Sequence, residues 1–491
     1  MSTPLQETKA HFIHGYRLHA RRNVQLVVAL VSLGLTLTQC ARPTQPPGPN
    51  VLLLVVDALR ADHVGLYGYS RKTSPRLDEY ARRGIVFDRA YAQASSTFPS
   101  TASILTGQYP SHAQIASAEH PFQLGQKCAT LAEVLSDAGY ETGFFSANPL
   151  HAYDSFGGGE QWSLGFEQGF HEFFVGSRFY GNRLRAETLN ERATEWIVEC
   201  YPDKPFLACI WYIDPHDPYE PPNEFRKLFP DSYEGDTDWN KKMGELLATG
   251  ESIPEEARQH LINLYDAEIA YTDSCIGTML DLLDREGILS HTLVIVTADH
   301  GEAFHDHGLW LHGFGLYEEL IRVPLVIIPP KAQARSEPSR NASLVGHIDL
   351  MPTILDYAGI ESAKRPREIQ GRSLEPLLTT PDAVIDRHAI AAEIVFGLKP
   401  SGEPGAYTGR ALITQRFKFI ETRERDKVAK TLFFDLEQDP LEQHSLADDP
   451  SSNAQVELLS AQLNLILGEQ GKSPGPLPQH VRDRLRALGY L

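Results

Sequence analysis

The sequence predicts an α/β protein: a large, mainly parallel sheet flanked by helices, followed by a smaller C-terminal α+β subdomain. Three observations predict this. Continuous apolar runs alternate with helical stretches, as expected for strands buried on both faces of a parallel sheet. Several of these runs end directly at acidic residues and histidines. From about residue 365 onward, shorter β-prone segments replace the alternation.

Four apolar runs are predicted to be strands of the large sheet: Val51–Val56, Phe206–Ile213, Thr292–Ala298 and Pro324–Ile328. The first ends at Asp57, the second at Asp214 and His216, and the third at Asp299 and His300. Open α/β sheets bind ligands outside the carboxyl ends of their strands. One Asp after a strand is usually a turn or a helix cap, but three strand ends of this kind predict a functional site.

The candidate ligands at these strand ends are of the type that binds a divalent cation. Asp57, Asp299 and His300 offer oxygen and nitrogen atoms, and "TADHGE" (297–302) places two of them side by side. A second metal is conceivable because the cluster 305–307 (His-Asp-His) follows in the same loop. Histidines in such loops more often form hydrogen bonds or face solvent, so one metal is favoured over two.

The stretch "TFPSTASILTG" is predicted to form a short helix that ends at Gly107. Pro99 is favoured at the first position of a helix, so Thr97 is expected at the N-terminus, where backbone amides favour an anion. Taken alone, Thr97 is best explained as a helix cap. A bound metal beside it would lower the pKa of its hydroxyl and make an alkoxide nucleophile accessible.

Residues 366–491 are predicted to form the smaller subdomain, and residues 50–365 the catalytic one. "YTGRALITQRFKFIETR" contains two β-prone runs, and "TLFFDLEQDPLEQHSLADDP" contains a strand followed by an acidic turn. The end of the chain, "HVRDRLRALGYL", has the pattern of a short amphipathic helix.

Residues 1–49 are predicted to be a signal or lipoprotein-like segment with a Pro-rich tether. An arginine pair precedes the apolar run Leu26–Leu37, which is shorter than the roughly 20 residues of a membrane span. Cys40 follows as in a lipoprotein precursor, although Gln39 is not the small residue expected there. We expect export to a bacterial cell envelope, either to the periplasm or as a membrane-anchored lipoprotein. Plain cleavage and an uncleaved anchor remain alternatives to lipidation at Cys40.

Charge and cysteine content limit the partners of the chain. Its 491 residues carry 45 basic and 64 acidic side chains, a formal net charge of −19, so no broad nucleic-acid-binding surface is expected. An anionic substrate must therefore be attracted locally. The other cysteines show no C-x-x-C pairing, and both disulfides and buried free thiols are open for them: Cys128, Cys200, Cys209 and Cys275.

From about Asn50 to its end, the chain resembles the sulfatase branch of the alkaline phosphatase superfamily. The resemblance is carried, in order, by "NVLLLVVDALRADHVGLYGY", "TFPSTASILTGQYP", "PHDPYEPP", "VTADHGEAFHDHG", "HGFGLYEELIRVPLVI", "HIDLMPTILDYAGI" and "FFDLEQDPLEQHSL". It implies metal-dependent ester hydrolysis and a large α/β domain with a smaller C-terminal sheet. It also implies that Asp57, Asp299 and His300 are metal ligands and that Thr97, at the nucleophile position, is both nucleophile and ligand.

Three further residues receive roles from the same resemblance. His216 falls on a histidine that contacts the substrate anion. His312 lies near a family position, often Lys or His, that serves the anion or the leaving group. Arg60 is expected to help hold the nucleophile or the anion, with a plain salt bridge as an equal alternative.

Several departures from the sulfatase pattern affect the expected chemistry. Ala58 replaces the second acid of the paired Asp-Asp of many sulfatases, and His300 stands where many calcium sulfatases have Asn. The segment Gly139–Pro149 lacks the Lys and His of the second sulfatase signature. Formylglycine, the sulfatase nucleophile, is made from Cys or Ser, and Thr97 cannot yield it because its extra methyl group would leave a ketone.

Threonine alkoxides serve in sister families of the superfamily, the nucleotide pyrophosphatase/phosphodiesterases and the phosphoglycerol and phosphoethanolamine transferases. Lipoteichoic acid synthase has a similar set: one acid, one Thr and an adjacent Asp-His around one metal. We therefore expect a hydrolase or transferase that cleaves a phosphate-type ester of a small-molecule, lipid-linked or glycan-linked anion through Thr97. One divalent ion is expected, and the His300 nitrogen favours manganese or zinc over calcium. Hydrolysis of a sulfate ester without formylglycine, and a catalytically inactive binding protein, are the alternatives.

Overall fold

The computed structural model describes residues 48–113, 124–125, 127–151, 164–176, 183–233, 235, 242, 246, 252–330, 339–380, 383–394, 407–424 and 427–468. The predicted export segment up to residue 47, with Cys40, and the predicted helix at 480–491 lie outside these residues. Both stay predictions.

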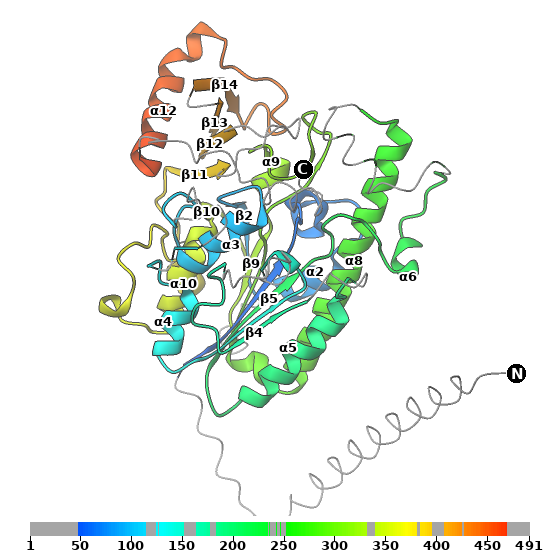
Figure 1. The fold of residues 1–491 in the computed structure, drawn as a ribbon, viewed down its shortest axis with the longest axis vertical. Helices are drawn as coiled ribbons and strands as arrows, with labels where there is room; N and C mark the ends of the chain where they lie inside the picture. The colour runs from blue at the N-terminus through cyan, green and yellow to red at the C-terminus, as the bar shows by residue number, and fades with distance from the viewer. Residues whose placement is uncertain are drawn as a thin grey trace, which may run out of the picture. The chain divides into compact units, whose positions relative to one another are not determined.

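An eight-stranded sheet forms the centre of the fold (Figure 1). Its strands, in spatial order, are β10 (Ser339–Gly346), β2 (Ile85–Tyr91), β9 (Leu325–Ile328), β6 (Thr292–Ala298), β1 (Asn50–Val56), β5 (Phe206–Tyr212), β3 (Glu141–Ser146) and β4 (Glu172–Val175). Strand β9 pairs antiparallel with β2 and β6, and the remaining pairs of this sheet are parallel. The predicted large, mainly parallel sheet is confirmed.

The strand predicted at Pro324–Ile328 starts one residue later than predicted, and it is the antiparallel member of the mainly parallel sheet. Strand β9 begins at Leu325, because Pro324 has no backbone N–H to donate to a sheet; its carbonyl instead accepts a hydrogen bond from the Thr297 hydroxyl at 2.8 Å. The chain leaves β6 at its carboxyl end and returns through β7 (Ala303–Phe304), β8 (Trp310–Leu311) and α9 (Glu318–Ile321). No long crossover helix carries it to the other end of the sheet, so β9 must run back.

Helices cover both faces of the large sheet (Figure 1). On one face, α3 (Thr97–Thr106), α4 (Leu131–Asp137) and α10 (Leu350–Tyr357) contact one another; on the other, α2 (Pro75–Ala81) and α5 (Ala186–Cys200) pack against α8 (Glu255–Arg285). Shorter helices fill connections: α6 (Asn223–Arg226), α11 (Glu375–Thr379) and single turns at Ala61–His63, Gly65–Tyr67, Pro149–His151, Ile288–His291, His347–Asp349, Ser362–Lys364 and Pro450–Ser452.

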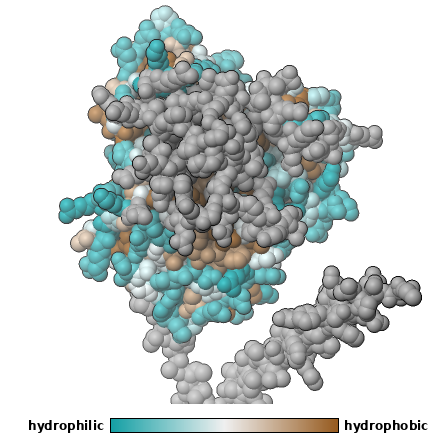
Figure 2. Space-filling model, viewed as in Figure 1, coloured by the Kyte–Doolittle hydropathy of each residue, from teal (hydrophilic) through white to brown (hydrophobic). Residues whose placement is uncertain are grey.

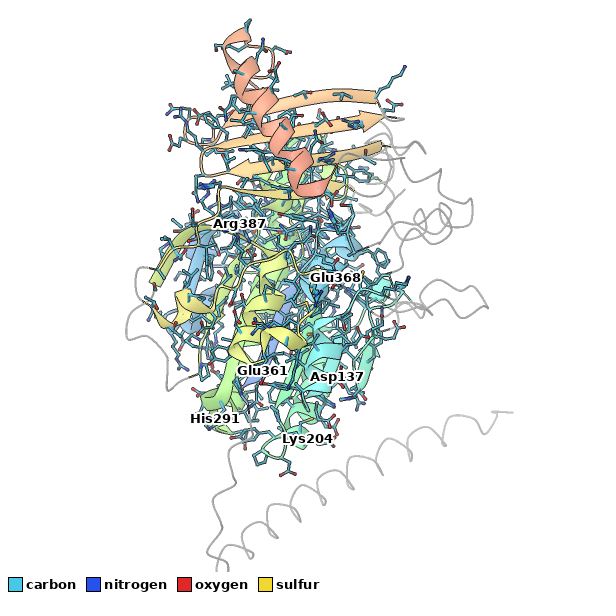
Figure 3. All side chains as sticks on the ribbon, turned by 90° about the vertical axis from the view of Figure 1, so that its left-hand side faces the viewer. Asp137, Lys204, His291, Glu361, Glu368 and Arg387 are labelled. Atoms are coloured by element: carbon cyan, nitrogen blue, oxygen red, sulfur yellow. The ribbon has the colours of Figure 1, made fainter. Side chains whose placement is uncertain are left out.

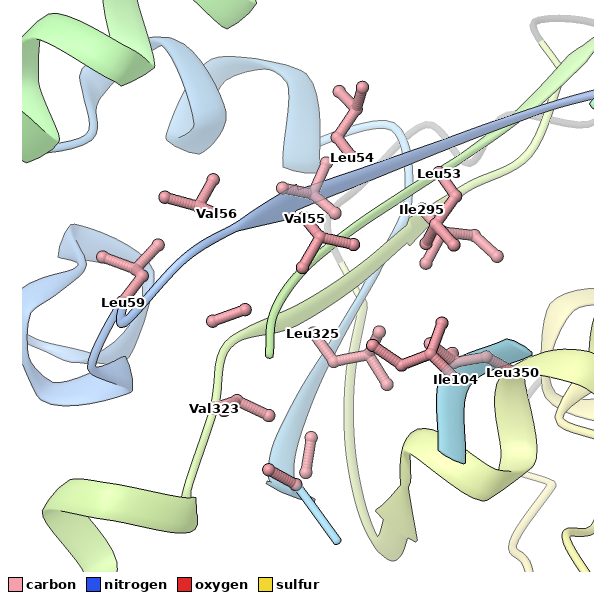
Figure 4. Packing of buried hydrophobic residues seen from close by; sticks show 14 of the residues in the cluster. Leu53, Leu54, Val55, Val56, Leu59, Ile104, Ile295, Val323, Leu325 and Leu350 are labelled. Atoms are coloured by element: carbon pink, nitrogen blue, oxygen red, sulfur yellow. The ribbon is translucent and has the colours of Figure 1, made fainter. Parts of the chain in front are cut away.

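The hydrophobic core lies between these layers. Every residue of β1, β5 and β6 is buried, as their continuous apolar sequences predict. Figure 4 shows Val55 and Ile295 from two of these strands close to Leu325 of β9, with Ile104 of α3 beside Leu350 of α10. Each such side chain contributes about 1.5–3 kcal/mol through its removal from water. The core therefore fixes the strands whose ends carry the candidate ligands.

A four-stranded antiparallel sheet follows in the C-terminal part. Its order is β11 (Ala389–Ile394), β12 (Tyr407–Thr414), β13 (Phe417–Glu424) and β14 (Lys427–Asp435), and α12 (Asn453–Leu467) lies across it (Figure 3). The predicted β-prone runs are β12, β13 and β14. The C-terminal subdomain is thus confirmed, while its boundary at residues 365/366 stays a prediction.

Strand direction decides where the site lies. Lys204 and His291, labelled in Figure 3, come just before β5 and β6 and mark the amino ends of these strands. At the opposite ends, Val56 of β1 pairs with Tyr212 of β5 and with Ala298 of β6. Because the three strands end in register, the residues that follow them, including Asp57 and Asp299, emerge side by side.

The described cysteines, surface and helices bear on disulfide bonding and on membrane crossing. Cys128, Cys209 and Cys275 are buried free thiols, which is the second of the two predicted alternatives, and Cys200 is a half-buried free thiol. On the face in Figure 2, the described residues mix hydrophilic areas with smaller hydrophobic ones. Among the described helices, none combines the length and apolar composition that crossing a membrane requires.

Candidate metal and nucleophile site

The structure brings Asp57, Asp299 and His300 together at the carboxyl ends of β1 and β6. Their potential ligand atoms all lie within 4.8 Å of one another, and all three side chains are fully buried. His300 Nε2 lies 3.6 Å from Asp57 Oδ1 and 3.8 Å from Asp299 Oδ2. Two residues that are far apart in the sequence from Asp57 thus share one small space with it, because β1 and β6 are neighbours in the sheet.

Thr97 lies beside the same group. It is the first residue of α3, Ser96 is the cap position, and Pro99 is the third helical residue, so the helix starts two residues earlier than predicted and Thr97 is not its cap. Its Oγ1 lies 3.3 Å from His300 Nε2. Gly107 ends the helix with φ 68°, as predicted, in the left-handed conformation that glycine adopts without steric cost.

The charges of this group fit a divalent cation. Burial, and then the neighbouring Asp299 carboxylate, raise the pKa of Asp57 well above its usual value. Asp57 Oδ1 is buried without a hydrogen-bond partner, and within the described residues no Lys or Arg forms an ion pair with either carboxylate. Buried carboxylates are normally paired or bound to a metal. Two acids and one imidazole in this space therefore lack a positive charge that a divalent cation would supply.

Outer contacts orient the two carboxylates. The Asn148 side-chain amide donates a hydrogen bond to Asp57 Oδ2 at 2.5 Å, and Trp211 Nε1 lies 3.4 Å from Asp299 Oδ2. Ala58, in place of a second acid, has φ 57°, and this left-handed turn directs its N–H to Asp299 Oδ1 at 3.2 Å. Hydrogen bonds of this kind commonly hold the ligands of a metal site in their orientation.

The protonation of His300 follows from its contacts. Its Nδ1 donates to the Gly301 carbonyl at 2.8 Å, so in the neutral ring Nε2 carries the lone pair. Burial lowers the pKa of His300 more than the Asp299 carboxylate raises it, which keeps the ring neutral. The lone pair of Nε2 consequently faces the Thr97 hydroxyl and the two carboxylates.

The two other predicted histidines form a row with His300. The ring centroids of His300 and His312 are 4.3 Å apart, and those of His312 and His216 are 4.8 Å apart. His312 Nδ1 is hydrogen-bonded to Glu302 Oε1 at 3.0 Å, and burial raises the pKa of Glu302 to about 8. His216 Nδ1 donates to the Asp217 carbonyl at 2.6 Å. Both rings are therefore held in fixed orientations beside the site.

The cluster suggested for a second metal is not assembled in the structure. Asp306 binds Arg60, His307 Nδ1 lies 2.7 Å from Glu319 Oε1, and the His305 ring packs on Trp310. Within the described residues, the side chains close enough to share a cation are Asp57 with Asp299 and His300, and His216 with Asp217 and His312.

Arg60 has the contacts of the salt-bridge alternative. Its guanidinium lies 2.8 Å from Asp62 Oδ2 and 3.0 Å from Asp306 Oδ2, and it donates to the Glu302 carbonyl at 3.1 Å. Burial would lower the pKa of Arg60, but Asp62 and Asp306 raise it well above its usual value. Among its described contacts none reaches Thr97, so a direct role at the nucleophile stays a prediction.

Sequence reasoning missed several residues at this site. Asn148 follows β3 and His347 follows β10, so both carry the same strand-end signal that identified Asp57. Burial lowers the pKa of His347 to about 4, partly offset by the nearby Asp299 carboxylate. Trp211, in contrast, lies inside β5, and its sequence position gives no sign of a polar contact.

The fold and the strand-end site are those of a hydrolase of the alkaline phosphatase superfamily, with a candidate site for a divalent metal. Residues 49–360 match the family model described as Sulfatase, and residues 305–468 match the model described as N-sulphoglucosamine sulphohydrolase, C-terminal. The first match covers more than half of the 491 residues. The chain belongs to the sulfatase family.

Similar proteins have names from both sulfur and phosphorus chemistry. The uncharacterized sulfatase YidJ of Escherichia coli (strain K12) is 25% identical over 446 residues, 82% of this chain and 83% of that protein. The multifunctional alkaline phosphatase superfamily protein PehA of Trinickia caryophylli is 26% identical over 489 residues, covering 83% and 93%. The solved phosphonate monoester hydrolase from Silicibacter pomeroyi shares the fold, with a TM-score of 0.66, 24% identity and coverage of 84% and 94%.

Proposed function

We propose that this sulfatase-family hydrolase cleaves a phosphate-type ester with Thr97 as the nucleophile. The observation that carries the proposal is the Thr97 hydroxyl at the start of α3, 3.3 Å from His300 Nε2. Thr97 occupies the position at which sulfatases form formylglycine, and its side chain cannot be converted to that group. A hydroxyl next to a cation-binding group is an activated nucleophile in its own right.

Asp57, Asp299, His300 and Thr97 would hold one divalent cation. The nitrogen ligand favours manganese or zinc, with calcium as the alternative. When bound, such an ion lowers the pKa of a coordinated hydroxyl and polarises a phosphoryl oxygen. The buried, partnerless Asp57 Oδ1 and the raised pKa of Asp57 support this assignment.

The residues of the chain then divide the reaction between them. Thr97 Oγ1 passes its proton to solvent water and attacks phosphorus; the new Oγ1–P bond forms as the P–O bond to the alcohol breaks. The departing oxygen keeps the bonding electrons and takes a proton from water. The oxygen of water, or of an acceptor hydroxyl, next bonds to phosphorus as the Oγ1–P bond breaks, and its proton restores the Thr97 hydroxyl. His216, His312 and the first amides of α3 bind the anionic oxygens.

Two alternatives use the same residues. The names of many relatives favour a sulfate ester as the substrate, attacked by Thr97 without formylglycine. A non-catalytic binding protein is disfavoured, because a decayed site would more readily have lost one of Asp57, Asp299 or His300. In each case the bound group is an anionic ester of a small molecule, a lipid or a glycan.

The test compares three proteins on four substrates. Wild type, Thr97→Ala and Thr97→Ser, each loaded with manganese or zinc, are assayed on nitrophenyl phosphate, bis-nitrophenyl phosphate, a nitrophenyl phosphonate and nitrophenyl sulfate. We expect phosphorus esters to be preferred, Thr97→Ala to lose several orders of magnitude in turnover, and Thr97→Ser to retain part of it. Thr106→Ala, in the same helix, is the matched control: its hydroxyl donates to the Ala102 carbonyl at 2.7 Å and accepts from the Gln108 N–H at 3.3 Å. Faster cleavage of the sulfate, or an active Thr97→Ala, contradicts the proposal.

We further propose that the protein is exported to a bacterial cell envelope, with Cys40 or the N-terminal segment as its membrane attachment. The arginine pair and the apolar run before Cys40 motivate this. Fatty-acid labelling that disappears in Cys40→Ser supports lipidation, whereas a full-length wild-type protein in the cytosolic fraction contradicts export.

A further inference from the structure

Arg183 makes an unusual set of contacts with the loop that carries His216. It lies shortly before α5, and only 8% of its side chain is exposed. Its Nη1 donates to the Pro218 carbonyl at 2.7 Å, and its Nη2 donates to the carbonyls of His216 at 2.7 Å and Ile213 at 3.2 Å. One planar guanidinium thus binds the backbone before, at and after the predicted anion contact.

Two buried carboxylates hold this guanidinium in place. Its Nε lies 3.1 Å from Asp214 Oδ1, and its Nη1 lies 3.2 Å from Glu268 Oε1 of α8. Glu268 Oε1 also accepts a hydrogen bond from the backbone N–H of Glu220 at 2.8 Å. Burial would lower the pKa of Arg183, but Asp214 and Glu268 raise it, so the group stays charged. The loop is consequently fixed to α8 through the guanidinium.

The same loop determines the direction of the His216 ring. With the backbone on both sides held, the bond from His216 Nδ1 to the Asp217 carbonyl sets the rotation of the imidazole. This ring packs on His312, which packs on His300, whose Nε2 lies next to the Thr97 hydroxyl. A shift of the loop would therefore move the anion contact relative to the nucleophile.

We propose that Arg183 is a positioning residue that sets His216 for the substrate anion. The proposal rests on the function proposed above, in which His216 contacts that anion. Arginine is needed because its rigid fork reaches three carbonyls and two carboxylates at once, whereas a lysine ammonium is a single point on a flexible stem. A displacement of about 1 Å in a group that orients a reacting anion costs on the order of 10²-fold in rate.

Arg185 provides a matched control in the same cluster. Its Nη1 lies 3.4 Å from Asp214 Oδ1 and its Nη2 donates to the Glu220 carbonyl at 2.9 Å, with 33% of the side chain exposed. Its described contacts do not include the carbonyls of Ile213, His216 or Pro218. Arg183 and Arg185 thus share a charge and a carboxylate partner but differ in their hold on the His216 loop.

The experiment is a double-mutant cycle with Arg183→Lys, His216→Ala and the double variant. The quantity measured is turnover of the nitrophenyl ester that wild type cleaves fastest. We expect Arg183→Lys to lose about 10²-fold in kcat/KM, with full metal content, and to lose little more when His216 is already Ala. Arg185→Lys should change kcat/KM less than about threefold, within the range of an exposed ion pair.

Two outcomes separate this inference from the proposed function. If His216→Ala lowers turnover but Arg183→Lys does not, or if the two losses multiply in the double variant, Arg183 is only structural and the inference is wrong. If His216→Ala itself leaves turnover unchanged, the proposed role of His216 fails. Glu268→Gln, which keeps the shape beside Arg183 and removes one charge, tests the same coupling if Arg183→Lys does not fold; its loss must also vanish in the His216→Ala background.

Discussion

Two buried acidic clusters in this protein differ in one feature, their source of positive charge. Asp57 and Asp299 share their space with a neutral histidine, His300, and with no Lys or Arg ion pair among the described residues. In the second cluster, Lys418 Nζ of β13 lies 3.1 Å from Glu318 Oε1 and 2.9 Å from Glu442 Oε1. The chain thus supplies its own cation in one cluster, and we propose that a bound metal ion supplies the charge in the other.

The location of each cluster explains the difference. The Lys418 cluster joins the C-terminal sheet to α9 of the large domain, and Glu442 also accepts a hydrogen bond from the Glu318 backbone at 2.7 Å. Burial would lower the pKa of Lys418, but Glu442 and Glu318 raise it, so the ammonium stays charged. The role of this cluster is structural: it links the C-terminal sheet to α9. The Asp57 cluster lies at strand ends beside a hydroxyl, where the proposed cation would take part in the reaction.

The largest effect is expected when a carboxylate is removed from the Asp57 cluster. Asp57→Asn should abolish metal binding and lower turnover by about 10³-fold or more, since a metal supplies several kcal/mol of charge stabilisation. The metal-free variant should be more stable than metal-free wild type, because a buried charge has gone. Elemental analysis and thermal unfolding of the metal-free proteins measure both, with the exposed Asp137→Asn as control. Retained metal in Asp57→Asn would remove the cluster's assigned role.

Lys418→Met is expected to have the next largest effect, and on stability alone. Removing one partner of a buried ion pair costs about 3–5 kcal/mol, because the remaining carboxylates lose their counter-charge. Metal content should not change. Denaturant unfolding measures the free energy, and Lys427→Met, at an exposed position of β14, should stay within about 0.5 kcal/mol of wild type. If Lys418→Met loses metal but keeps its stability, the two clusters do not have the separate roles assigned to them.

Asn148→Ala should have a smaller effect, on the metal affinity of the Asp57 cluster. The substitution removes the hydrogen bond to Asp57 Oδ2. Loss of a hydrogen bond to a metal ligand typically lowers metal affinity by about 10–100-fold. Competition with a chelator of known affinity measures the change. Full metal content at saturating metal is expected as well, and an unchanged affinity would exclude Asn148 from the metal site.

The smallest effect concerns pH. The pKa of Asp57 is raised in the folded protein, so its protonated form stabilises the metal-free protein at low pH, and this contribution is lost as pH rises through that pKa. Because the cation competes with that proton, the stabilisation by added metal should increase with pH, by about 1.4 kcal/mol per pH unit for one proton. Thermal unfolding with and without metal from pH 5 to 8 measures it. A gain that is constant or falls with pH contradicts the assignment of Asp57.

The parts of this molecule that sequence could predict are those governed by local pattern. The apolar runs of β1, β5 and β6 predict the bounds of these strands to within one residue, because strands buried on both faces need continuous apolar sequence. The start of α3 was misplaced by two residues because Pro99 is tolerated anywhere in the first turn of a helix.

Features that depend on three-dimensional neighbours escaped prediction. The reversed direction of β9 follows from how the β6–β9 connection returns to the sheet, which composition does not specify. Asn148 and Arg183 act through partners more than 25 positions away, Asp57 and the loop around His216. Their residue types are ordinary for surface loops, and only the fold reveals that both are buried and bonded.

Acid-quenched mass spectrometry can detect the covalent bond between Thr97 and phosphorus that the proposed reaction requires. Metal-loaded enzyme is mixed with bis-nitrophenyl phosphate, quenched within one turnover and digested. We expect the peptide that contains Thr97 to carry one nitrophenyl phosphoryl group, located on Thr97 by fragmentation, and the same peptide of Thr97→Ala to carry none. Turnover of the diester without any adduct on Thr97, or with the adduct on another residue, would show that Thr97 is not the nucleophile.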